Sequence, residues 1–336
     1  KKKIKNIKIS DILKIKAHKN KDNNCINISV YNFMDFINCP TSFFMNLLLE
    51  VSDIKYSIHP KDKNDIKRGI FWHSVMSTAS KDKDFYSSDK EKIIKTIENS
   101  INQNLKNLKQ ERPEVFDEID EASFINQSKA KIIRFAENES NRQKKLNLLP
   151  EKNEVLLHFK IATINEIPLN LQGKIDRIDT SKSLEQLFIW DYKIGKKKNL
   201  SFRGKYYIFS KSSVSFQQLA LYAYLVKKNK KNCREINCFN IFIDGSDNSK
   251  DKDYKNFYEI NEAIDIIENI YIPALTKILE FSIVEILKPN EIESKIRNKI
   301  EINYNEKMFT LNCIFCDFKN ICKMLQYHNF NEVKNA

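Results

Sequence analysis

The chain has 336 residues, 41% of them hydrophobic, which is enough for one large domain with a sizeable core. Its formal net charge of +13 favours a polyanionic partner, because basic side chains that neutralise phosphates release counterions. No apolar run approaches the roughly 18–20 residues that span a bilayer, and the lysine-rich start lacks an apolar signal segment, so we expect a cytoplasmic protein without a membrane anchor.

The N-terminal region changes character near residue 29. Residues 1–28 are basic and weakly patterned, which predicts a linker or arm. Ser29 is expected to cap a helix over residues 30–37, because serine side chains accept hydrogen bonds from free N–H groups at helix starts. Pro40 interrupts the apolar pattern, and a second helix is expected over residues 43–49.

Helical patterns continue through the next hundred residues. A helix is expected over residues 70–77. Isoleucine and leucine then recur at helical spacing over residues 93–108, and a second amphipathic stretch covers residues 124–135. We therefore predict a helical insertion at about residues 81–150.

The pattern changes to strands and then back to helices. Strands are expected within residues 155–193 and over 236–243, and a helix over 216–228 separates them. A long apolar helix is expected over residues 263–287, with a kink at Pro273. This order predicts one α/β fold with a small mixed central sheet flanked by helices.

The most informative residues are Asp191 and Lys193, which end an apolar strand candidate at residues 187–193. Because side chains alternate along a strand, both should point to one face while Trp190 and Tyr192 point to the other. One face would then present a carboxylate beside an ammonium group.

A second strand candidate over residues 169–179 carries Asp176, and the turn-like residues 180–183 join it to the Asp191 strand. A hairpin would bring Asp176 close to Asp191 and Lys193. Two carboxylates and a lysine suit Mg²⁺ or Mn²⁺ chemistry on a phosphodiester. The alternative is an exposed hairpin with ordinary surface ion pairs.

Three cysteines near the end form a C-x₂-C-x₅-C pattern, and Cys39 lies far upstream beside a proline. Such spacing predicts a metal or cluster site rather than disulfides, and four thiolates suit either an iron-sulfur cluster or structural zinc. The alternative is that these cysteines are small buried hydrophobic residues. That alternative is favoured for Cys25, Cys233 and Cys238.

Together, these features resemble the RecB-like branch of the PD-(D/E)XK nucleases, most closely the C-terminal nuclease domain of AddB-type helicase-nuclease subunits. The resemblance covers residues 29–325 and leaves 326–336 as a tail. The motifs occur in the family's order and comprise 36–40, 69–73, 173–179, 191–193, 218–222 and the three terminal cysteines. The resemblance implies a restriction-endonuclease-like core.

The resemblance implies that Asp176 and Asp191 bind Mg²⁺ or Mn²⁺ with help from the backbone carbonyl of Tyr192. Lys193 would be the catalytic lysine, and His73 matches the histidine that lies near the metal. Without the resemblance, His73 is more simply a core histidine on a helix.

Gln218 and Tyr222 lie one helical turn apart and share a face, which in the family borders the site and contacts substrate; helix packing is the alternative. Glu154 stands where many relatives carry an acidic residue before the sheet. Asp179 is expected to pair with Arg177 or another cation rather than with the metal.

The resemblance also favours a [4Fe-4S] cluster over Zn²⁺, a metal-cluster staple that would join distant parts of the domain. Its implied ligands are Cys39, Cys313, Cys316 and Cys322.

The implied activity is Mg²⁺-dependent hydrolysis of DNA, mainly at single-stranded ends, within a helicase-nuclease that processes double-strand breaks. The sequence has no Walker A loop, so a helicase subunit or an upstream helicase-like region would supply unwinding. Two alternatives remain: a stand-alone exonuclease like the four-cysteine CRISPR-associated nucleases, and a catalytically silent, cluster-containing DNA-binding module.

Overall fold

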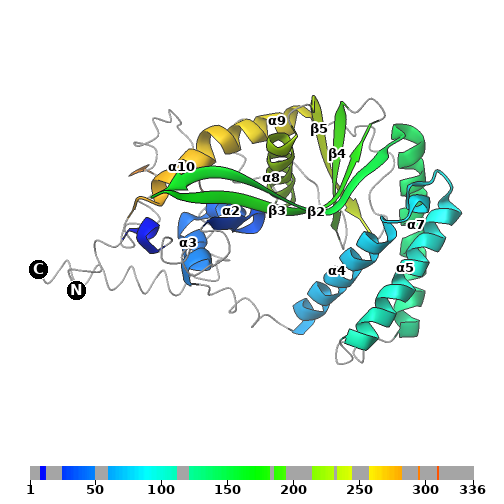
Figure 1. Ribbon diagram of the computed structural model, residues 1–336. Coiled ribbons are helices and arrows are strands. Elements are labelled where there is room, and N and C mark those ends of the chain that lie inside the picture. The colour runs from blue at the N-terminus through cyan, green and yellow to red at the C-terminus, as the bar shows by residue number, and fades with distance from the viewer. Residues whose placement is uncertain are drawn as a thin grey trace, which may run out of the picture.

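A five-stranded mixed sheet separates two layers of helices in the computed structural model of the protein (Figure 1). The strands are β1 (Ile26–Ser29), β2 (Leu149–Ile164), β3 (Ile167–Thr180), β4 (Gln186–Lys193) and β5 (Glu235–Phe242). The structure describes residues 8–12, 25–49, 60–111, 121–181, 185–193, 214–230, 233–243, 257–281, 294–295 and 309. The predicted α/β class with a small mixed sheet is confirmed.

Strand β3 is the centre of the sheet. Its whole length pairs antiparallel with β2, while its other edge pairs first with β1 in parallel and then with β4 antiparallel. β5 continues the sheet in parallel with β4. The β2–β3 turn is Asn165–Glu166, and both residues have positive φ values of 47° and 69°, as a two-residue turn of the twist-matched type requires.

The sheet begins inside the segment that we predicted to be an arm. β1 includes residues 26–28, and the N–H of Ile9 donates to the carbonyl of Phe281 at 3.0 Å. Ile9 is also buried. A four-residue strand is too short to show a clear alternation in sequence, so its place in the sheet depends on pairing with β3.

One helical layer packs on the sheet through the larger core. It contains α2 (Val30–Asn38), α3 (Pro40–Leu49), α8 (Val214–Asn229), α9 (Phe257–Ile266) and α10 (Ile272–Ile278). The predicted cap is confirmed, because the Ser29 hydroxyl accepts the Asn32 N–H at 3.1 Å. The long C-terminal helix is interrupted before Pro273 by the π-helical turn Ile267–Tyr271, and α10 ends at Ile278 rather than near residue 287.

The other layer covers the opposite face of the sheet. It contains α4 (Pro60–Ala79), the 3₁₀ turn Lys83–Tyr86, α5 (Lys90–Glu111) and α7 (Glu121–Leu146), which Figure 1 shows gathered together at one end of the molecule. The second core joins these helices to Trp190 and Tyr192 of β4. The described part of residues 81–146 is largely helical, and its apolar side chains contribute to the smaller of the two hydrophobic cores. Among the described residues, none of these helices or any other has the length and apolarity needed to cross a bilayer.

Gly173 on β3 lies where the first layer comes closest to the sheet. A Cβ atom at this position would stand 2.8 Å from Val30 Cγ2 and 3.0 Å from both Leu225 Cδ1 and Tyr222 Cε1. Glycine is needed because any side chain would push these neighbours away. The glycine of the 173–179 motif thus sets how closely α2 and α8 approach β3.

A buried ion cluster joins the sheet to α7. Arg177 of β3 donates from Nε to Asp179 Oδ1 at 3.0 Å and from Nη2 to Glu139 Oε1 of α7 at 2.9 Å. Asp179 also accepts the indole N–H of Trp190 at 2.8 Å, and Glu139 pairs with Arg142. Although burial acts in the opposite direction, Arg177 and Arg142 lower the pKa of Glu139 to about 2. The predicted Arg177–Asp179 pair is confirmed.

We predict that Arg177→Met lowers the free energy of unfolding by about 3–5 kcal/mol, because it leaves a buried carboxylate without its counter-charge. A matched control is Arg234→Met, since Arg234 and Glu185 form an exposed pair with Nη1 and Oε1 3.4 Å apart. That control should cost no more than about 1 kcal/mol. Urea unfolding of both variants tests this, and equal losses would contradict it.

Candidate active site

The end of β4 presents the predicted pair of charges. Asp191 and Lys193 both line a cavity of about 630 Å³ on one face of the sheet, whereas Trp190 and Tyr192 are buried in the second core. The predicted alternation along this strand is confirmed. The Lys193 ammonium group forms an ion pair with Asp191.

The predicted hairpin brings Asp176 to the same cavity. Backbone pairing of β3 with β4 runs from Thr180–Leu187 to Arg177–Trp190. Beyond the last pair, the Tyr192 N–H donates to the Asp176 side chain, at Oδ2 and 2.8 Å, instead of to a backbone carbonyl of β3. This bond fixes one carboxylate oxygen of Asp176 at the point where the strands separate.

Gln218 of α8 connects the charged residues. Its Oε1 accepts from Lys193 Nζ at 2.8 Å. Its Nε2 lies 2.9 Å from the Tyr222 hydroxyl, 3.1 Å from the Tyr31 hydroxyl and 3.3 Å from Asp191 Oδ1. Because an amide nitrogen has only two hydrogens, these three oxygens share them. Gln218 and Tyr222 share a helix face as predicted, and Gln218 touches both Asp191 and Lys193.

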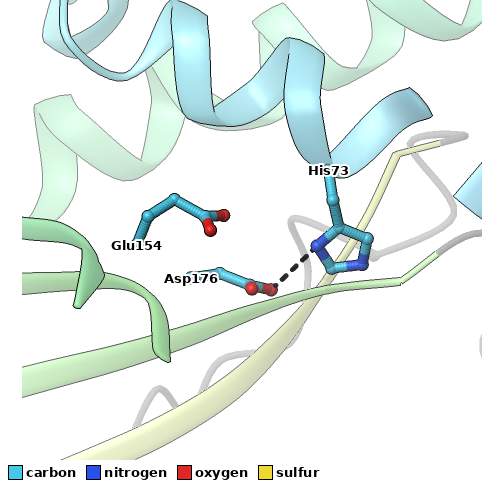
Figure 2. A group of neighbouring side chains, drawn as sticks. All are labelled: His73, Glu154 and Asp176. Carbon is cyan, nitrogen blue, oxygen red and sulfur yellow. Dashed lines mark ion pairs between the residues drawn. The ribbon is translucent and has the colours of Figure 1, made fainter. Parts of the chain in front are cut away.

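His73 and Glu154 join Asp176 beside this network to form a group of possible metal ligands. His73 Nδ1 of α4 lies 3.4 Å from Asp176 Oδ2, and Glu154 of β2 completes a group whose ligand atoms all lie within 4.8 Å of one another. Figure 2 shows both side chains directed at Asp176 from the helix and the neighbouring strand. Asp191 lines the same cavity but is paired with Lys193 and Gln218 instead.

Glu154 reaches the site through its register with β3, and its backbone is unusual. Glu154 has a φ of 51°, in the left-handed region that a glutamate rarely adopts. Its neighbours pair as Asn153–Arg177 and Val155–Ile175, so Glu154 stands opposite Asp176. Asn153 is held by its side-chain N–H donated to the Ser80 carbonyl at 2.8 Å. Strained backbone of this kind often occurs at functional sites, and here it accompanies a carboxylate at the cavity.

The electrostatics favour a bound cation. Burial, together with the neighbouring Asp176 carboxylate, raises the pKa of Asp191 to about 6 although Lys193 opposes the shift. The hydrogen bond to Asp176 raises the pKa of His73. Asp176 and Asp191 repel each other, although Lys193 pairs with Asp191 and Lys174 pairs with Glu154, and a divalent cation would reduce the repulsion that remains. Carboxylate oxygens are the ligands that Mg²⁺ and Mn²⁺ prefer, so the oxygen donors of this group fit such an ion, whereas the His73 imidazole is the less usual ligand.

Other predicted site residues do not line this cavity or lie outside the described residues. Cys39 lies half-buried between α2 and α3, while Cys313, Cys316 and Cys322 lie outside the described residues. The basic run 196–198 is also outside them. Lys228, from the second basic run, pairs with Glu268 of the π-helical turn.

Sequence reasoning gave Glu154 little weight and missed Tyr31. The hairpin turn at Asn165–Glu166 points to this part of β2 but is one residue off, because counting back from it aligns Val155 with Asp176. A bulge between Lys160 and Ala162 shifts the register by one and places Glu154 there instead. Tyr31 is 59% exposed on α2, and a surface position on an amphipathic helix gives no such signal.

Comparison with known proteins identifies the class of this fold and site. The chain belongs to the PD-(D/E)XK nuclease superfamily, which it matches over residues 27–323. The superfamily supports nuclease chemistry with a divalent metal and DNA as substrate. No curated protein matches the chain.

Among solved structures, the chain is similar to the one described as "Crystal structure of SSO0001". The two are 11% identical, and the similarity covers 94% of this chain and 95% of that chain with a TM-score of 0.31.

We predict that Gln218→Leu lowers kcat for DNA cleavage by about a hundredfold, because Lys193 and Asp191 lose the side chain that orients them and small misplacements are costly. KM should change much less. Gln217→Leu is a matched control, since the adjacent Gln217 is also buried but hydrogen-bonds with Asn38. Steady-state kinetics of both variants test this; similar kcat values would contradict it.

Proposed function

We propose that this protein is a metal-dependent deoxyribonuclease whose reaction takes place between β3, β4, α4 and α8. The observation that supports it most is the meeting of Asp176, Asp191 and Lys193 in one cavity, with His73 and Glu154 at its side. Two acidic side chains and a lysine from neighbouring strands are the set that phosphodiester hydrolysis by this superfamily requires.

In this proposal, Asp176, Glu154 and His73 hold Mg²⁺ or Mn²⁺, with Asp191 and the Tyr192 carbonyl as the further ligands that the resemblance implies. When bound, the ion polarises a phosphoryl oxygen and lowers the pKa of a water. The hydrogen bond from the Tyr192 N–H to Asp176 supports this role. It occupies one lone pair of Asp176 Oδ2, and the other lone pairs of the carboxylate can face the cavity.

Lys193 provides the positive charge that the reaction needs. Its ammonium group has three donors, which are shared between Asp191, Gln218 and the cavity. From there it would orient the attacking water or stabilise negative charge that develops on the phosphate. Gln218 keeps the ammonium group at this position while its amide nitrogen reaches Asp191.

We further propose that the nuclease works within a helicase-nuclease that processes double-strand breaks. The order of the motifs across residues 29–325 supports this setting. A stand-alone exonuclease of the four-cysteine CRISPR-associated type is the alternative, and its second acidic motif often carries glutamate where this chain has Asp191. Co-purification of a helicase subunit from the native source would favour the first setting.

The proposed [4Fe-4S] cluster has indirect structural support. Phe309 is buried against α2, with its ring centroid 5.7 Å from that of Phe36. Cys39 follows Phe36 by three residues, and Cys313 follows Phe309 by four. Chain segments of that length span at most about 10–14 Å, so the position of Phe309 is compatible with a site shared by Cys39 and Cys313. Iron-sulfur ligation remains our proposal, with zinc as the alternative.

We predict that the purified protein cleaves DNA only with Mg²⁺ or Mn²⁺ and that EDTA abolishes cleavage. Asp191→Ala and Lys193→Ala should each lose cleavage by at least about 10³-fold, because the first removes a proposed metal ligand and the second removes the positive charge that interacts with the reacting phosphate. Asp265→Asn, an exposed carboxylate on α9, is the control and should retain full activity.

The same assay separates this proposal from a silent DNA-binding module. That alternative predicts background cleavage in the unmodified protein as well as in Asp191→Ala, with DNA binding intact in both. Metal-independent cleavage, or cleavage unaffected by both substitutions, would overturn the assignment of the site.

We also predict about four iron atoms per chain and a visible charge-transfer absorption after anaerobic purification, as a cubane cluster requires. Cys313→Ser should lose both signals and lower the unfolding temperature, because the cluster links distant parts of the chain. Cys238→Ser is the control, since Cys238 is buried in the main core. Protein that contains zinc and no iron would replace the cluster with a zinc site.

A further inference from the structure

Exposed apolar side chains are concentrated at the candidate active site. Five large hydrophobic residues are exposed among those described, and three of them line the 630 Å³ cavity. These three are Tyr31 of α2, Ile70 of α4 and Leu156 of β2, which are 59%, 68% and 60% exposed. Because they line the cavity and still face solvent, they lie at its opening together with the exposed Ser74 and Lys174, and we call these three apolar residues the apolar collar.

The collar stands around a strongly polar floor. Below it lie the carboxylates of Asp176, Asp191 and Glu154 and the ammonium group of Lys193. A phosphodiester substrate has the complementary composition, with a charged phosphate beside a flat apolar base. In a duplex the base faces are covered by stacking, whereas in a single strand they are free to contact aromatic and aliphatic side chains.

Tyr31 links the collar to the reacting groups. Its hydroxyl lies 3.1 Å from Gln218 Nε2, and Gln218 in turn contacts Lys193 and Asp191. The Tyr31 ring is therefore tethered at its polar end while most of its surface remains open. A base that stacks on this ring would be held at a fixed offset from Lys193, which places its phosphate over the proposed metal ligands.

We propose that the apolar collar is a nucleobase subsite, in which Tyr31 stacks on one unpaired base while Ile70 and Leu156 contact its edges. The proposal rests on the nuclease function above and names the residues that make the site selective for unpaired DNA. Tyr31, Ile70 and Leu156 are thus specificity-determining residues rather than metal ligands.

Binding measured without cleavage tests the collar separately from catalysis. Fluorescence anisotropy in EDTA would compare an ordinary single strand with an abasic strand of equal length and charge. The unmodified protein should bind the ordinary strand more tightly. Tyr31→Ala should reduce that preference by about tenfold, and Ile70→Ser and Leu156→Ser by about threefold each, while affinity for the abasic strand stays unchanged.

The chain itself offers matched controls. Ile133 of α7 and Leu149 of β2 are the other two exposed hydrophobic residues of the described set, and neither lines the cavity. Ile133→Ser and Leu149→Ser should therefore leave the preference intact. Tyr31→Phe should keep most of it, because the ring remains and only the hydrogen bond to Gln218 is lost.

Each outcome decides between distinct explanations. Equal binding of ordinary and abasic strands by the unmodified protein would overturn the subsite even if cleavage is normal. Loss of thermal stability in the collar variants with an unchanged preference would show that the collar packs against another part of the chain, which also overturns it. Conversely, a collar-dependent preference without Mg²⁺-dependent cleavage would retain the subsite and reject the nuclease function.

Discussion

The buried pairing of Arg177 with Asp179 and Glu139 is the constraint on which the rest of the structure depends. A guanidinium group in an apolar interior is tolerable only beside opposite charge, so these groups must stay together. Arg177 directly follows Asp176, and Asp179 also binds Trp190 of β4. The cluster therefore fixes both strands of the hairpin from behind, while the opposite face presents the reactive groups.

The core of the site was predictable because its causes are local. Alternation along β4 places Asp191 and Lys193 together whatever the rest of the fold does, and a short turn brings Asp176 beside them. The Ser29 cap and the helical face shared by Gln218 and Tyr222 follow from equally local rules. The central sheet and its class were predictable for the same reason.

The remaining features depend on long-range register. Glu139 meets Arg177 across 38 residues of sequence, and no periodicity indicates that partner. Glu154 stands opposite Asp176 because a bulge between Lys160 and Ala162 shifts the β2–β3 register by one, and sequence patterns predict neither that bulge nor the left-handed backbone of Glu154. Similarly, β1 became recognisable only through its pairing with β3, and the role of Tyr31 only through its bond to Gln218.

The origin of Glu139 and Arg142 in α7 has a consequence for protein engineering. α7 could be taken for a removable addition to the catalytic core. It supplies Glu139, which pairs with the buried Arg177 of the sheet, and Arg142, which pairs with Glu139. A trimmed version without them would expose Trp190 to water and leave a guanidinium group with half its compensation. The smallest autonomous form of this enzyme scaffold must therefore retain the second helical layer.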